Sequence, residues 1–69
     1  MAMVTIYRFK GWDNREGGYT EIDPRWGTRE AIGRVKGIVI EASGVDIDDV
    51  LLSRDLPGFT ERDFVPPPG

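Results

Sequence analysis

Cysteine and histidine are both absent from this sequence of 69 residues. Thiolate and imidazole are the usual ligands of structural zinc, so their absence excludes zinc fingers and zinc ribbons. It also excludes catalysis by a thiol nucleophile or by a serine–histidine pair. A cation site built only from carboxylates remains compatible with the composition.

Long apolar runs and phosphate-binding loops are missing as well. No apolar segment reaches half the length of a membrane span, and residues 1–10 lack a charged segment followed by an apolar one. Neither G-x-G-x-x-G nor G-x-x-x-x-G-K followed by Ser or Thr occurs. We therefore expect a cytoplasmic protein without an export signal, a membrane contact, a cofactor or an enzymatic activity.

The length of the chain predicts one domain with one small core. A domain of about 60 residues buries only about 60% of the surface that its unfolded chain exposes, so its stability is only a few kcal/mol. Because no disulfide or zinc site is available, self-association is the remaining means of stabilisation, and we expect a homodimer. We assign residues 1–65 to a single domain and the Pro-rich residues 66–69 to a C-terminal tail.

The first part of the hydrophobic pattern predicts a β-hairpin. Residues 3–10 are rich in β-branched and aromatic side chains, which indicates a strand. Residues 11–18 contain Asn and Gly residues typical of an exposed turn. Residues 19–23 alternate in polarity and predict a second, antiparallel strand, which Pro24 ends because proline cannot donate a ladder hydrogen bond.

A short helix is predicted next, over residues 28–36. Thr28 can accept hydrogen bonds from the first free N–H groups and thus act as the N-cap, and Gly37 is a natural stop. Glu30 and Arg34 stand four residues apart in the order that favours a salt bridge. Its apolar side contains Ala31, Ile32 and Val35, and we expect this helix to cover the sheet with one edge only.

The following segments complete the expected fold. The β-branched residues 38–40 predict a strand buried on both faces at the centre of the sheet. Residues 45–52 have two interpretations: a half-exposed strand, which we favour, or a helical turn capped by Asp48. The sequence thus predicts an α+β fold in which a small, mainly antiparallel sheet of three to four strands packs against one short helix, in ββαβ-like order. Three later apolar residues are expected to fold back on the core: Leu56, Phe59 and Phe64.

Charge is distributed unevenly along the chain, whose net charge is −3. Residues 1–36 carry seven basic and five acidic side chains, whereas residues 37–69 carry two basic and seven acidic ones. A rigid array of carboxylates can occupy a basic channel of a nucleic-acid-handling protein by presenting a negative surface similar to that of a duplex. We predict that an acidic interaction surface is formed by six residues, namely Asp46, Asp48, Asp49, Asp55, Glu61 and Asp63.

In size, acidity and lack of catalytic residues the chain resembles phage-encoded inhibitors such as the anti-CRISPR proteins. The resemblance covers composition and no motif, so no functional residue is transferred from that group. It implies a non-catalytic inhibitor that docks on a basic site of a nucleic-acid-handling complex. The alternatives are a structural or regulatory module that acts through homo-oligomerisation, and a small ligand or cation carrier.

Other residue patterns give weaker functional signals. An EF-hand loop starting at Asp46 needs glycine at its sixth position and glutamate at its twelfth, where the chain has Leu51 and Pro57, so we expect no metal. Four basic residues near Trp26 could contact phosphates, namely Arg25, Arg29, Arg34 and Lys36. The acidic net charge argues against direct nucleic-acid binding. Of Trp12 and Trp26, we expect one to pack in the core and the other to be a possible interface aromatic.

Overall fold

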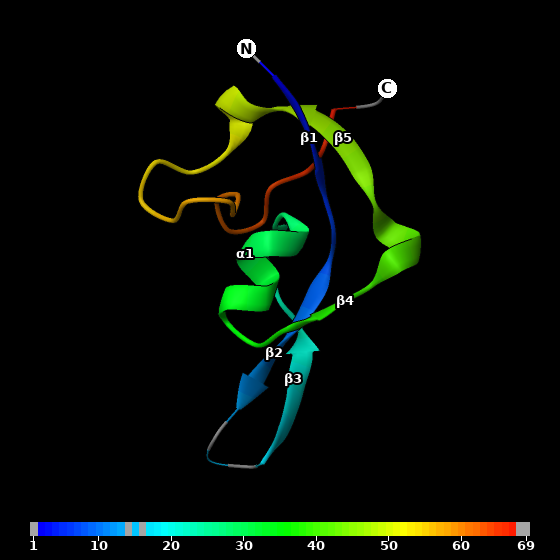
Figure 1. The fold of residues 1–69 in the computed structure, drawn as a ribbon, viewed down its shortest axis with the longest axis vertical. Helices are drawn as coiled ribbons and strands as arrows, with labels where there is room; N and C mark the ends of the chain where they lie inside the picture. The colour runs from blue at the N-terminus through cyan, green and yellow to red at the C-terminus, as the bar shows by residue number, and fades with distance from the viewer. Residues whose placement is uncertain (1, 14, 16, 68–69) are drawn as a thin grey trace.

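The computed structural model describes residues 2–13, 15 and 17–67 of the chain. Its elements follow the order β1, β2, β3, α1, β4, β5, with a short 3₁₀ turn (η1) before β5 and another (η2) after it. They form two small antiparallel sheets and one short helix, which confirms the predicted α+β class. The predicted single sheet in ββαβ-like order is not matched exactly, because β1 and β5 form a sheet of their own. The molecule is elongated, with extents of 38 × 24 × 19 Å. The β1–β5 pair occupies one end and the β2–β3 hairpin the other (Figure 1).

The first sheet consists of β1 (Met3–Ile6) and β5 (Val45–Asp48). The two strands pair antiparallel, with Val4 opposite Ile47 and Ile6 opposite Val45. Ile6 and Ile47 are buried, while Thr5 and Asp46 are exposed on the other face. The alternation in both strands thus places aliphatic residues toward the core and polar ones toward solvent.

The second sheet has the order β3-β2-β4, formed by β2 (Phe9–Asp13), β3 (Gly18–Ile22) and β4 (Ile38–Val39). Its β2–β3 hairpin confirms the predicted antiparallel pair, although the turn includes residues 14 and 16, which lie outside the described residues. The prediction that residues 38–40 form the centre of the sheet is wrong. β4 is a two-residue edge strand with Ile38 44% exposed, and β2 is central instead.

The predicted continuous strand over residues 3–10 is interrupted. Between β1 and β2, Tyr7 exchanges backbone hydrogen bonds with Gly27, and the Arg8 N–H donates to the Ser43 hydroxyl at 2.7 Å. The buried side chains on the two sides of this break are Ile6 and Phe9. Their odd spacing is incompatible with one face of a regular strand, whose period is two residues. The partner strands are interrupted as well. The turn η1 (Glu41–Ser43) lies between β4, which pairs with β2, and β5, which pairs with β1.

The helix α1 (Arg29–Arg34) is shorter than the predicted range but begins as expected. The Ala31 N–H donates to Thr28 Oγ1 at 3.2 Å, which confirms Thr28 as the N-cap. At the other end the Gly37 N–H donates to the Ile32 carbonyl and the Lys36 N–H to the Gly33 carbonyl, the pattern of a Schellman motif. Lys36, with φ of 58°, occupies the left-handed position that glycine usually takes.

Both interpretations of residues 45–52 hold in part. The favoured strand exists as β5, and Asp48 then accepts a hydrogen bond from the Val50 N–H at 3.1 Å and caps η2 (Asp49–Leu51). No helix in the described part of the chain has the length and hydrophobicity of a membrane-spanning segment.

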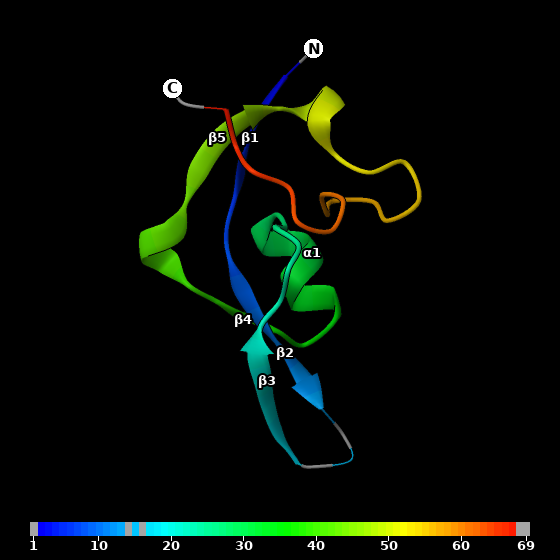
Figure 2. The same ribbon diagram turned by 180° about the vertical axis from the view of Figure 1, so that it is seen from behind.

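The C-terminal segment, by which we mean residues 56–67, completes the core, as predicted for Phe59. The chain leaves η2 and returns past α1 (Figure 2). There the Phe59 ring packs on Phe9 at a centroid distance of 5.4 Å, and Gly27 pairs with Phe59 on the side opposite Tyr7. The buried apolar residues are few: Ile6, Phe9, Ala31, Ile32 and Ile47. Of the predicted tail, residues 68 and 69 lie outside the described residues.

Candidate functional site

Two adjoining depressions lie where the β2–β3 hairpin, the end of α1 and the C-terminal segment meet. Their volumes are about 280 Å³ and 180 Å³, and they share three lining residues, namely Val35, Leu56 and Phe59. We call them together the apolar groove. The first is also lined by Phe9, Gly11, Trp12, Asp23 and Arg25, and the second by Ala31, Arg34 and Pro57.

Local structure explains why these apolar side chains remain accessible. Val35 is the C-cap of α1, beyond the buried face of the helix, and is 48% exposed. Leu56 lies in the loop between Ser53 and Phe59 and is 39% exposed. Trp12, on β2, is 41% exposed and packs edge-on against Tyr19, its cross-strand partner on β3, at 5.0 Å between ring centroids.

Trp26 has a different environment from Trp12. It is half-buried, its indole Nε1–H donates to the Phe64 carbonyl at 3.1 Å, and the Arg8 guanidinium lies 5.2 Å from its ring centroid. The polar end of the indole is thus used to hold the C-terminal segment. Of the two tryptophans, only Trp12 lines the groove.

Among the described residues that line the groove, two arginines and one carboxylate carry charge. Arg34 Nη2 donates to the Pro57 carbonyl at 3.3 Å, rather than forming the predicted pair with Glu30. The Arg25 backbone N–H donates to Asp23 Oδ1 at 2.9 Å, and the Arg25 Nε is buried without a hydrogen-bond partner among the described residues. Cationic groups therefore outnumber carboxylates in the groove lining.

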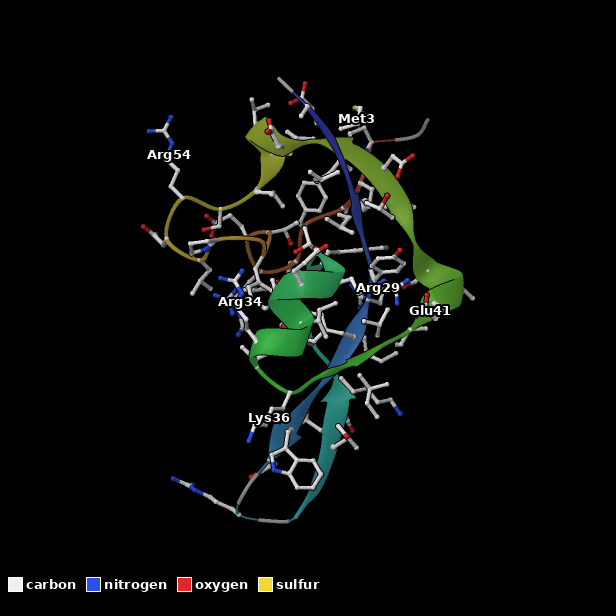
Figure 3. The ribbon with its side chains drawn as sticks, viewed as in Figure 1. Met3, Arg29, Arg34, Lys36, Glu41 and Arg54 are labelled. Carbon is white, nitrogen blue, oxygen red and sulfur yellow. The ribbon has the colours of Figure 1, made fainter. Side chains whose placement is uncertain are left out.

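A separate polar cluster joins α1 to η1 (Figure 3). Both terminal nitrogens of Arg29 donate to the Glu41 carboxylate, with Nη2 at 2.7 Å from Oε2. Nη2 also donates to the Tyr7 hydroxyl at 3.2 Å, and the guanidinium lies 5.0 Å from the Tyr7 ring centroid. The hydrogen bonds from Arg29 lower the pKa of Glu41, and those to Glu41 and Tyr7 raise the pKa of Arg29.

This cluster has the properties of a structural link. A carboxylate and a guanidinium that hold each other fully ionised are poorly suited to exchange protons near neutral pH. A depression of about 300 Å³ adjoins Arg29 and is lined by Val4, Thr5, Tyr7, Thr28 and Glu30. Arg29, which the sequence grouped with Arg25 and Arg34, is thus directed to a different surface from theirs.

The six residues of the predicted acidic surface lie on three segments. Asp46, Asp48 and Asp49 belong to β5 and η2, Asp55 to the loop before Leu56, and Glu61 and Asp63 to the C-terminal segment. Five are exposed and Asp48 is half-buried. Asp48 caps η2, and Asp46 accepts a hydrogen bond from the Thr5 hydroxyl. Within residues 2–13, 15 and 17–67, no group of three or more carboxylates lies close enough to hold a metal ion.

The sequence predicts several members of the groove but not the groove itself. Its pattern marks Trp12 as an aromatic of interest and predicts that Leu56 and Phe59 fold back. It also places Val35 on the apolar side of the helix, although Val35 is the cap residue and half-exposed. No local pattern predicts the groove, because it forms only where the segment after η2 returns to Phe9 and to the end of α1.

Comparisons with protein-family models, with curated proteins and with solved structures gave no match. The functional argument therefore rests on the geometry described above.

Proposed function

We propose that this chain is a non-catalytic protein-interaction protein, an inhibitor-like module that docks its acidic surface on a basic site of a larger, nucleic-acid-handling protein. One observation supports this most directly. Among the described residues there is one salt bridge, between Arg29 and Glu41, and none of the six acidic residues takes part in it. Their charge is therefore available to a basic partner.

The placement of the six residues suggests how such a surface would work. Asp46, Asp49 and Asp55 project from β5, η2 and the following loop, and these elements are tied to the body by backbone hydrogen bonds such as Asp49 to Ala2 at 2.8 Å. Carboxylates on a tethered framework lose less side-chain and backbone freedom on binding than those on a disordered tail. The acidic surface would thus act as a preformed array.

The test compares charge-neutral variants in affinity capture from the native host. A quadruple variant with Asp46→Asn, Asp49→Asn, Asp55→Asn and Glu61→Gln removes charge but leaves the Asp48 cap intact. We expect the wild type to retain a basic protein that is released as the NaCl concentration rises from about 0.1 to 0.5 M, since the Debye length falls to a few Å over this range. The quadruple variant should fail to retain it.

A matched control removes acidic charge elsewhere. Glu21 on β3 and Glu30 on α1 are both exposed and lie outside the proposed surface. The double variant Glu21→Gln with Glu30→Gln should capture the same protein as the wild type. Equal capture by the quadruple variant and the wild type would refute the proposal.

Homo-oligomerisation is the second candidate, and the open sheet edges favour it. β3 and β4 are both edges of the three-stranded sheet, and residues 19–22 of β3 are all exposed. Unpaired edge strands readily pair with another chain. Light scattering after size-exclusion chromatography tests this: a dimer at tens of micromolar protein supports it, and a strict monomer contradicts it.

A further inference from the structure

The apolar groove is a second surface, distinct in chemistry from the acidic one. Its lining contains five large apolar side chains, of which Trp12, Val35 and Leu56 are each between 39% and 48% exposed. Both depressions are open to solvent and share three residues, so they form one continuous open site rather than two enclosed cavities. An open site of this shape fits an extended or helical peptide better than a small enclosed ligand.

The groove combines apolar and cationic groups. Arg25 lines one depression and Arg34 the other, while Asp23, the one carboxylate among the described lining residues, already accepts from the Arg25 backbone N–H. Lys36 follows Val35 directly and is exposed at the end of α1, near the hairpin (Figure 3). Asp55 precedes Leu56 but lines neither depression. The apolar groove therefore lies among more positive than negative side chains.

We propose that the apolar groove binds a segment of another protein in which large apolar side chains alternate with carboxylates. The apolar side chains of that segment would fill the two depressions, on either side of Val35, Leu56 and Phe59. Its carboxylates would pair with Arg25 and Arg34, whose guanidinium groups suit bidentate contacts with carboxylates. This surface is independent of the acidic surface, because none of the six acidic residues lines it.

Aliphatic and proline side chains distinguish this site from a nucleic-acid platform. Single-stranded nucleic acid is usually held by aromatic rings that stack on successive bases along a basic track. Of the three aromatic rings in the lining, Phe9 is buried and Phe59 half-buried, and the exposed one, Trp12, is accompanied by Val35, Leu56 and Pro57. This lining fits an apolar side chain of a peptide better than a nucleobase, and an oligonucleotide becomes the competing probe in the test.

The experiment titrates the isotope-labelled chain of 69 residues with synthetic probes and follows its NMR spectrum. The first probe is the acidic apolar peptide Glu-Asp-Leu-Phe-Asp-Leu-Glu. The second is its basic counterpart Lys-Arg-Leu-Phe-Lys-Leu-Arg, and the third is the acidic polar peptide Glu-Asp-Ser-Asn-Asp-Ser-Glu. The fourth probe is an oligothymidylate. We expect the first probe to shift the Val35 and Leu56 methyl signals and the Trp12 indole signal, with an affinity at least about tenfold above that of the other three.

Two variants and two matched controls locate the binding site. Val35→Ser and Arg34→Glu change the groove at exposed positions, and each should weaken binding of the first probe by about tenfold or more. Val50→Ser changes an exposed valine of η2, and Arg54→Glu changes an exposed arginine that lies apart from Arg34 (Figure 3). Both controls should bind like the wild type. A thermal melt of each variant verifies that it is folded.

Each contrary outcome overturns the proposal. Tighter binding of the basic peptide or of the oligonucleotide would show that the charge complementarity is wrong. Shifts confined to β5 and η2, or no binding of the acidic apolar peptide at millimolar concentration, would show that the groove is not its site. Dimerisation that is abolished by Val35→Ser would assign the groove to a second copy of this chain. None of these results depends on the acidic-surface variants, so the two proposals fail separately.

Discussion

Single residues in this small domain combine conformational and packing roles, and Gly58 is the clearest case. Gly58 has φ of +85°, and its carbonyl accepts a hydrogen bond from the Thr28 N–H at 2.8 Å, which ties the C-terminal segment to the start of α1. A Cβ at this position would lie 2.6 Å from the Ala31 Cβ. The left-handed backbone and the close approach thus both require glycine.

Gly58→Ala should therefore destabilise the protein, and Gly33→Ala should stabilise it. At Gly58 the added methyl meets Ala31 and a strained backbone, so we expect a loss of about 2 kcal/mol or more. Gly33 lies inside α1, and a Cβ added there would meet no neighbouring side chain within 4 Å, so alanine should add about 0.5–1 kcal/mol through helix propensity. Urea unfolding followed by tryptophan fluorescence measures both. Equal destabilisation by the two substitutions would contradict this assignment.

Lys36 shows a residue-scale departure from the sequence prediction. The sequence predicts that Gly37 ends the helix, and the Gly37 N–H does close the Schellman motif with Ile32. The left-handed position, however, belongs to Lys36. The sequence thus predicted where the helix ends. It did not predict which residue adopts the left-handed conformation, because glycines flank residues 34–36 on both sides and Lys36, rather than a glycine, takes that position.

At the scale of elements, the sequence predicted the caps and turns, which depend on residues close together in the chain. Thr28 caps α1 and Asp48 caps η2 because each side-chain oxygen satisfies a free N–H nearby in the sequence. The hairpin forms because two segments that favour the strand conformation are separated by turn residues. By contrast, residues 38–40 are as apolar as a central strand, yet they form an edge because β2 pairs on both of its sides. Composition alone cannot tell which of two apolar strands is central.

The link between α1 and η1 gives a pH-dependent prediction at this scale. Arg29 lowers the pKa of Glu41, so the pair contributes stability above the ordinary glutamate pKa of about 4.3. This contribution is lost as the pH falls through the lower pKa of the folded state, because protonation removes the charge that Arg29 binds. Glu41→Gln should thus be less stable than the wild type at pH 7, and the difference should vanish in strong acid. Urea unfolding across this pH range measures it.

Glu21→Gln is the control for this pH dependence. Glu21 is exposed on β3 and forms no salt bridge with a described residue. Its substitution should leave the difference from the wild type nearly constant with pH. A Glu41→Gln difference that persists unchanged at low pH would show that packing of the side chain, rather than its charge, links α1 to η1.

At the scale of the whole molecule, the uneven charge of the sequence does not become a basic end and an acidic end. The acidic β5 and η2 lie at the end opposite the β2–β3 hairpin (Figure 1), but β1, from the more basic half of the chain, pairs with β5 at that same end. The sequence of the hairpin, residues 9–22, contains three acidic and two basic residues. The sequence also could not anticipate the apolar groove, which brings Phe9 and Trp12 together with Val35, Leu56 and Phe59.

The groove and the core both depend on the C-terminal segment, and Thr60 holds that segment in place. Thr60 is fully buried; its N–H donates to the Trp26 carbonyl, and its hydroxyl accepts from the Trp26 N–H at 2.9 Å and donates to the Glu61 carbonyl at 3.0 Å. Residues 57–64 are thus tied to the folded unit by hydrogen bonds. The few buried apolar side chains leave little stability in reserve if this anchor is weakened.

Thr60→Val tests whether the whole molecule unfolds as one unit through this anchor. Valine has the size of threonine but leaves the part-buried Trp26 N–H without its acceptor, so we expect a loss of about 1–3 kcal/mol. Thr60→Ser retains the hydroxyl and should lose about 1 kcal/mol for the missing methyl group. If the segment is integral, thermal melts followed by circular dichroism and by tryptophan fluorescence should coincide in every variant. If fluorescence instead changes at a lower temperature than the secondary structure in Thr60→Val, the segment detaches before the rest, and the groove is a dynamic rather than a preformed surface.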